Sequence, residues 1–149
     1  MRYAKVFVVR WADCDANGHM RNTAYSEYAI ETRLSYFAER GFPVARFAQL
    51  GIGPVLRREE IDFKRELHIG ETVEVDMTCV GVSPDGARFK IGHEFWRPGA
   101  KQSARLVVSG GWMDLRARKL VLPPPELKAA MFAAPMAEPL EELPPLKTG

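Results

Sequence analysis

The pattern of hydrophobic and polar positions predicts a strand, then a long helix, then a series of strands. Tyr3 to Trp11 is apolar at both odd and even positions, which predicts a strand buried on both faces. A helix is expected from Asn22 or Thr23, either of which is a good N-cap, to about Arg40. Gly41 follows directly and is a typical helix-ending residue.

The long helix is apolar over most of its circumference and leaves only a narrow polar stripe of Glu27, Glu31 and Ser35. A helix of this kind is enclosed by other structure. Because flat packing cannot enclose one helix, the sheet that follows must curl around it. The sequence therefore predicts an α+β fold in which a curled antiparallel sheet wraps around one long central helix.

The second half of the chain is expected to supply most of that sheet. A short helix over Val44 to Leu50 precedes four or five long antiparallel strands. In chain order these segments are Val55 to Leu67, Thr72 to Val82, Ala87 to Trp96, Ser103 to Met113 and Lys119 to Leu122. The four residues from Ser83 to Gly86 predict a hairpin turn between two of them.

The chain of 149 residues is long enough for one domain with a substantial core. We expect residues 1–124 to form this domain and residues 125–149 to form a C-terminal extension, since most of the 11 prolines lie near that end. The extension is expected to begin with a short helix, Pro125 to Phe132. An extended or loose tail is expected after it.

Composition excludes several classes of function. The hydrophobic fraction of 46% and the charged fraction of 27% are those of an ordinary globular protein, and the net charge of +2 favours neither nucleic acid nor an anionic membrane as partner. Cys14 and Cys79 are expected to be reduced thiols in a cytoplasmic protein, because no secretion signal is visible. No Cys and His spacing is typical of a metal site, so none is predicted.

Residues suited to acyl-transfer chemistry are concentrated in the loop before the long helix. Asp13, Asp15 and His19 precede Asn22 at the predicted start of the helix. Such a loop brings an acid and the unpaired N–H groups of a helix N-terminus to one point. Acyl transfer needs a group that activates water and donors for a developing oxyanion.

The motif D-x-D-x-x-G-H-x-x-N-x-x-Y over Asp13 to Tyr25, together with a meander ending in K-L-V-x-P-P, resembles the hotdog-fold acyl-CoA thioesterases. The group it resembles most is the 4-hydroxybenzoyl-CoA thioesterase-like group, over roughly Lys5 to Pro124. Arg21 departs from the pattern, in which a second asparagine is common. The resemblance implies that Asp15 carries the chemistry and that backbone N–H groups near Asn22 polarise the carbonyl. It also implies homodimers joined sheet edge to sheet edge, often homotetramers, with sites lined by both subunits.

The candidate catalytic residues are Asp15, His19 and Asn22, each with a structural alternative. Asp15 is expected to act as base or as nucleophile, and its alternative is an Asx-turn residue. His19 either contacts the thioester or water, or holds the loop through a ring hydrogen bond. Asn22 is either only an N-cap or also a source of the carbonyl-binding amide. Asp13 is expected to be structural.

The candidate substrate-binding residues are Gly18, Tyr25, Glu60 and Arg97. Gly18 is expected either to adopt a positive φ or to let the substrate approach the backbone closely. Tyr25 is expected in the core with its hydroxyl in the pocket wall. Glu60, or its neighbour Glu59, is placed to reach across a dimer interface. Basic residues near strand ends offer sites for the phosphates of CoA: Arg57, Arg58, Lys64, Arg65, Arg88, Lys90, Arg97 and Lys101.

The expected activity is hydrolysis of an acyl-CoA to free acid and CoA by a homo-oligomer, without metal or organic cofactor. Three alternatives stay open on the same or a related fold. One is an acyl-carrier-protein thioesterase, one is a non-catalytic acyl-CoA-binding protein, and one is a hydratase. The sequence does not specify the acyl chain.

Overall fold

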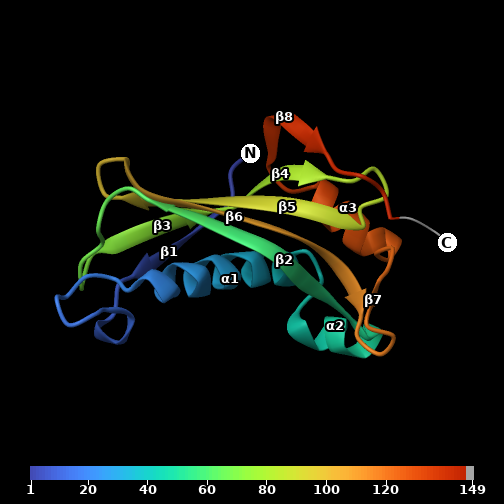
Figure 1. Ribbon diagram of the computed structural model, residues 1–149, viewed down its shortest axis with the longest axis horizontal. Coiled ribbons are helices and arrows are strands. Elements are labelled where there is room, and N and C mark those ends of the chain that lie inside the picture. Colours follow the sequence, from blue (N-terminus) through green and yellow to red (C-terminus); the bar gives the residue numbers. More distant parts are fainter. Residues whose placement is uncertain (147–149) are drawn as a thin grey trace.

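A curled, mostly antiparallel sheet covers the long helix α1 (Asn22–Glu39) in the computed structural model, which describes residues 1–146 (Figure 1). The sheet has eight strands. They are β1 (Ala4–Val8), β2 (Ile52–Phe63), β3 (Thr72–Asp76), β4 (Thr78–Val82), β5 (Arg88–Arg97), β6 (Lys101–Asp114), β7 (Lys119–Leu120) and β8 (Met136–Glu142). Two shorter helices are α2 (Val44–Leu50) and α3 (Pro125–Phe132). The predicted α+β architecture is confirmed.

The strand order places β2 alone at one edge of the sheet. Within residues 1–146, β2 pairs only with β6, β6 pairs with β5, and β5 continues to β3 and β4. The long β2–β6 pair runs from Ile52 opposite Asp114 to Phe63 opposite Ala104. Its register has one irregularity, between Leu56 and Arg58. This register brings the end of β2 over the first turns of α1, where the Tyr25 and Phe63 rings meet edge to face at 5.1 Å.

The core lies between α1 and the concave face of the sheet. Tyr25, Tyr28, Tyr36 and Phe37 of α1 are buried there. They pack with inward side chains of the sheet such as Phe89, Phe95 and Trp112. Another face of α1 stays open in the single chain, since Ile30 and Leu34 are 41% and 36% exposed.

Three local expectations differ from the structure. The first strand is not buried on both faces: the face of β1 that carries Val6 and Val8 is uncovered, and these side chains are 63% and 58% exposed. Asn22 is not the N-cap of α1 but its first helical residue, and Arg21 takes the cap position. The segment Thr72 to Val82 is interrupted at Met77, and its two halves pair with different outer strands, β1 and β8.

The tail after α3 is expected to be extended or loose, and residues 136–142 are extended, in the strand β8. The helix α3 forms as predicted and buries Leu127 and Met131. Directly after it, β8 joins the sheet in parallel to β4, introduced by a hydrogen bond from the Cys79 amide to the Pro135 carbonyl at 2.7 Å. Without β8 the outer edge of β4 would expose unpaired backbone groups, so the extension satisfies them. Along residues 1–146, no helix combines the length and apolarity needed to cross a bilayer.

Candidate active site

The loop between β1 and α1 is folded around the Asp15 carboxylate. Its Oδ1 atom accepts hydrogen bonds from the backbone amides of Asn17 at 2.9 Å and His19 at 3.2 Å. Gly18 allows the tight turn because its φ is +77°, a value that other residues rarely adopt. Asp15 is therefore an Asx-turn residue through Oδ1. Its other oxygen, Oδ2, accepts no hydrogen bond from residues 1–146.

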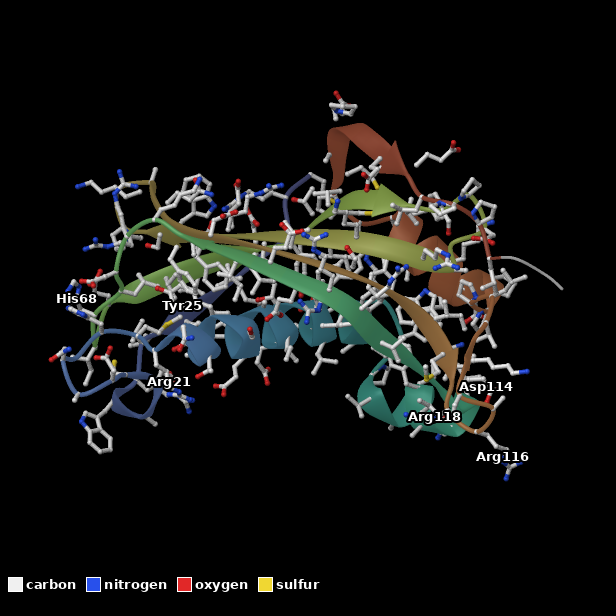
Figure 2. All side chains as sticks on the ribbon, in the orientation of Figure 1. Arg21, Tyr25, His68, Asp114, Arg116 and Arg118 are labelled. Atoms are coloured by element: carbon white, nitrogen blue, oxygen red, sulfur yellow. The ribbon has the colours of Figure 1, made fainter. Side chains whose placement is uncertain are left out.

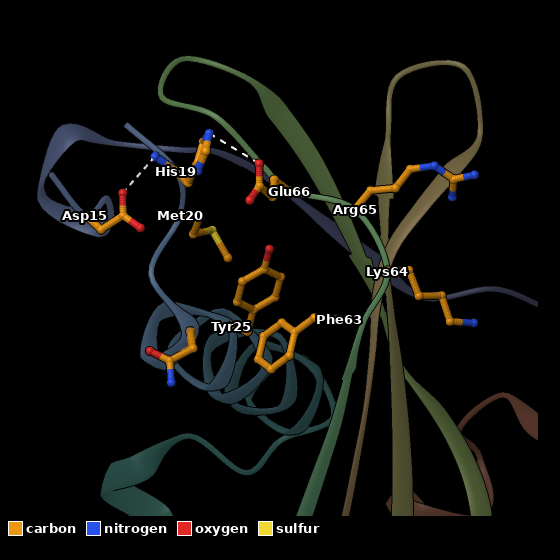
Figure 3. A pocket seen from close by; sticks show the side chains of 9 residues that line it. Asp15, His19, Met20, Tyr25, Phe63, Lys64, Arg65 and Glu66 are labelled. Atoms are coloured by element: carbon orange, nitrogen blue, oxygen red, sulfur yellow. Dashed lines mark hydrogen bonds and ion pairs between the residues drawn. The ribbon is translucent and has the colours of Figure 1, made fainter. Parts of the chain in front are cut away.

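A cavity of about 330 Å³ opens beside this loop (Figure 3). It is lined by residues from the loop, from the start of α1, from the end of β2 and from the connection between β2 and β3. These residues are Asp15, His19, Met20, Asn22, Tyr25, Phe63, Lys64, Arg65 and Glu66. Four of the sequence-predicted residues, namely Asp15, His19, Asn22 and Tyr25, thus share one cavity.

The loop is attached to the connection between β2 and β3. The Met20 amide donates to the Leu67 carbonyl at 2.7 Å, and the Ile69 amide donates to the Gly18 carbonyl at 3.1 Å. The His19 ring lies with Nε2 3.3 Å from a carboxylate oxygen of Glu66 (Figure 3). His19 therefore holds the loop through a ring contact and also lines the cavity, so both of its predicted roles fit its position.

The N-terminus of α1 reaches the cavity at Asn22. The cap residue, Arg21, makes no side-chain hydrogen bond to the first helical amides. Instead its guanidinium bonds the Thr23 hydroxyl at 3.0 Å and the Ala12 carbonyl, which ties the loop to the helix. The first N–H groups of a helix lack intrahelical partners and carry partial positive charge. No side chain of residues 1–146 caps these amides; the Ala24 amide donates to the Arg21 carbonyl at 3.0 Å, and Asn22 lines the cavity.

Asp13 is structural, as predicted. Its carboxylate is 1% exposed and does not line the cavity. The Arg10 guanidinium bonds it at 3.1 Å, and the Tyr28 hydroxyl donates to it at 2.6 Å. These hydrogen bonds, the one from Arg10 first, lower the pKa of Asp13 to about 2. The two aspartates of the motif therefore have separate tasks, one fixing the loop base and one facing the cavity.

Tyr28→Phe is expected to destabilise the protein by about 1.5–3 kcal/mol, because it removes a buried hydrogen bond to a charged group. The measurement is urea unfolding at pH 7. Tyr36→Phe is the matched control, since the Tyr36 hydroxyl donates at the same 2.6 Å to a neutral acceptor, the Ala130 carbonyl. That loss should cost about 0.5–1.5 kcal/mol. Equal losses in the two variants would contradict a charged Asp13.

Tyr25 lies at the back of the cavity, as expected. The residue is 3% exposed, and Figure 3 shows its hydroxyl directed into the space between Met20 and Glu66. Burial raises the pKa of this phenol to about 12, so it stays a hydrogen-bond donor at neutral pH. Phe63 stacks edge to face against its ring and adds an apolar wall.

Sequence reasoning missed Met20, Phe63 and Glu66 as cavity residues, although it included Lys64 and Arg65 among the basic candidates. No motif marks Glu66, since only the β2–β6 register brings the end of β2 to the loop. Lys64 and Arg65 are fixed by hydrogen bonds to the side chain and the carbonyl of Gln102, at 3.0 and 2.9 Å. Their charged ends therefore point away from Asp15 and Tyr25 (Figure 3).

Three predicted substrate-binding residues, Gly18, Glu60 and Arg97, do not line this cavity in the single chain. Glu60 is exposed on β2 and pairs with Arg58 at 2.8 Å, and Arg97 pairs with Glu71 at 3.0 Å. A role for Glu60 across a dimer interface stays a prediction, as does phosphate binding by Arg97. Figure 2 shows Tyr25, Arg21 and His68 together at one end of the molecule, while the turn of Arg116 and Arg118 lies at the other.

Solved structures with the same fold include several thioesterases. A 1,4-dihydroxy-2-naphthoyl-CoA thioesterase from Synechocystis superposes with a TM-score of 0.80 at 20% identity, covering 89% of this chain and 97% of that one. A DHNA-CoA thioesterase from Staphylococcus aureus gives 0.79 at 17% identity, covering 87% of each chain. Another S. aureus protein, solved in complex with CoA, gives 0.82 at 14% identity, covering 89% and 82%.

Sequence comparison gives the family. A search of curated protein sequences found no match. The family model described as the thioesterase-like superfamily, by contrast, matches residues 9–131, which include the loop, α1, the strands β2 to β7 and nearly all of α3. With most of its length covered by that match, this chain belongs to the thioesterase-like superfamily.

Proposed function

We propose that this protein hydrolyses an acyl-CoA thioester to the free acid and CoA, with Asp15 as the base or the nucleophile. One observation carries the proposal: Asp15 and the uncapped N-terminus of α1 line the same cavity. An activating carboxylate and a set of oxyanion donors are the two parts that the reaction requires. Membership of the thioesterase-like superfamily supports the same chemistry.

Asp15 fits either of two routes. As a base, Oδ2 takes a proton from water while the water oxygen bonds to the thioester carbon; the C–S bond then breaks and the CoA thiolate regains a proton. As a nucleophile, Oδ2 bonds to that carbon and expels the thiolate, and water hydrolyses the resulting mixed anhydride. Both routes use the oxygen that the Asx turn leaves free.

The amides at the start of α1 are proposed to bind the carbonyl oxygen. Negative charge develops on that oxygen as the carbon becomes tetrahedral, and the positive end of α1 stabilises it. A single donor of this kind contributes about 2.7–4 kcal/mol in other acyl-transfer enzymes. Asn22 would then act through its backbone N–H.

The surroundings of the cavity suit CoA and a second subunit. Lys64 and Arg65 belong to the cavity lining, and their side chains would turn away from Gln102 to bind phosphate groups. The β2 edge is open, and Leu56 and Phe63 on this strand are 44% and 54% exposed. Exposed apolar side chains along an unpaired edge favour association, so we propose a homo-oligomer formed through this edge.

A thiol-release assay tests the proposed activity. The panel consists of short, medium and long aliphatic acyl-CoAs together with phenylacetyl-CoA and hydroxybenzoyl-CoA, and the same acyl groups on a carrier protein form a second arm. We expect turnover on at least one CoA ester. Turnover on the carrier-protein esters alone would show that the acyl group of the substrate is carried by a protein and not by CoA. Binding of acyl-CoA without turnover on either arm would contradict an enzyme and leave a binding protein.

A further inference from the structure

Two histidines that are distant in the sequence meet at the cavity rim. His19 in the loop and His68 in the β2–β3 connection form an isolated backbone bridge, and their rings pack edge to face with centroids 4.7 Å apart. Glu66 lies beside them. One ligand atom each from His19, Glu66 and His68 falls within 4.8 Å of the other two. His19 and Glu66 already approach to 3.3 Å.

The His68 ring is oriented by neighbours that do not belong to the cluster. Its Nδ1 lies 2.6 Å from Oε1 of Glu71, which also accepts the His68 backbone amide at 3.0 Å. The second oxygen of Glu71 accepts from the Arg97 guanidinium at 3.0 Å. A carboxylate on one ring nitrogen is the usual support for a histidine that binds metal through the other nitrogen. Glu71 and Arg97 thus provide that support before any ion arrives.

We propose that His19, Glu66 and His68 bind a divalent transition-metal ion, with Zn²⁺ as the best match. Two imidazoles and one carboxylate are a common ligand set for Zn²⁺, with water completing a tetrahedron. The ligands are accessible, since the side chains of His19, Glu66 and His68 are 30%, 67% and 47% exposed. Mg²⁺ and Ca²⁺ favour sites with oxygen ligands only, and so they fit this cluster poorly.

The position of the cluster gives the ion an effect on the cavity. His19 and Glu66 line the same cavity as Asp15, and the His19 amide is hydrogen-bonded to the Asp15 carboxylate. A metal at this position occupies the cavity rim and adds a further link between the loop and the β2–β3 connection. We therefore expect the ion to stabilise the fold and to inhibit hydrolysis. The inhibition rests on the proposed function, whereas the binding does not.

Titration calorimetry with ZnCl₂ on tag-free, chelator-treated protein tests the binding directly. We expect one Zn²⁺ per chain, a higher melting temperature with Zn²⁺ than with a chelator, and no competition by excess Mg²⁺. His68→Gln should lose the site, so that its melting temperature is the same with Zn²⁺ as with a chelator. Glu71→Gln keeps all three ligands and should weaken binding by about 10–100-fold.

Cys14→Ser is the matched control, because Cys14 is a potential metal ligand in the same loop outside the cluster. It should bind Zn²⁺ like the unmodified protein. Failure of the unmodified protein to bind, or equal binding by His68→Gln, would overturn the site. Loss of binding in Cys14→Ser alone would assign the ion to the thiol and also overturn it.

The activity arm uses His68→Gln as well, since His68 does not line the cavity. Zn²⁺ should inhibit thioester hydrolysis by the unmodified protein and have little effect on this variant. If Zn²⁺ binds without inhibiting thioester hydrolysis, the proposed effect of the ion on the cavity is overturned. If no thioester is hydrolysed by the metal-free protein, the proposed function fails, and the calorimetric result still decides the metal site.

Discussion

Asp15→Asn is expected to lower kcat/KM by a factor of about 10²–10⁴ on whichever thioester the protein hydrolyses, which is the usual contribution of a positioned acid or base. The fold should survive. An asparagine side-chain oxygen can still accept the amides of Asn17 and His19, so the Asx turn is kept while the basic oxygen is lost. The effect should fall mainly on kcat, because the group acts in the transition state.

Steady-state kinetics of thiol release check this result, with circular dichroism as the test of folding. Glu142→Gln is the control, since Glu142 is an exposed carboxylate on β8, outside the cavity and on a strand that does not pair with β2. It should retain full activity. If Asp15→Asn keeps more than about a tenth of the activity, the loss is smaller than a catalytic base accounts for, and Asp15 is excluded as that base. Glu66, the other cavity carboxylate, would then be the candidate.

Stability is expected to fall steeply in acid because of His93. This residue on β5 is fully buried, with Nδ1 2.7 Å from the Asp76 carbonyl and Nε2 3.1 Å from the Arg33 guanidinium. Burial first, and the Arg33 charge second, lower the pKa of His93 to about 3. The unfolded chain binds this proton at about pH 6.5 and the folded chain does not. Each pH unit between 6.5 and 3 should therefore remove about 1.4 kcal/mol of stability.

Asp13 adds to the loss at lower pH. Its folded pKa of about 2 lies below its unfolded value, so the carboxylate stabilises the fold above about pH 4 and loses this contribution as the pH falls toward 2. Asp13 and His93 therefore act in the same direction in successive pH ranges. Together they predict acid unfolding before the pH reaches 2.

Urea unfolding between pH 8 and pH 4 in the presence of a chelator measures the slope. His93→Gln should flatten it by about 1.4 kcal/mol per pH unit below pH 6.5, whatever its effect on stability at neutral pH. Equal slopes in the His93 variant and the unmodified protein would show that His93 takes up its proton in the folded state.

Much of the fold was predictable because its signals are local. The periodicity and the Gly41 signal placed α1 within about one residue of its observed bounds, and the predicted bounds of α2 and α3 agree with the structure. A helix apolar on most sides implied a curled sheet. The expectation that β1 is buried on both faces was wrong, and the pairing of β8 with β4 was not predicted. Both depend on segments distant in the chain, which no local pattern specifies.

The sequence by itself determined the helices, the general architecture and the loop that carries Asp15, since each depends on residues within a few turns of one another. Only the tertiary structure decided which residues face that loop. The β2–β6 register places residues 63–66 at the cavity. The backbone bridge places His68 next to His19. These contacts depend on strand pairing between segments that are far apart in the sequence. A shift of the pairing register by one residue would turn every side chain of the strand to the opposite face.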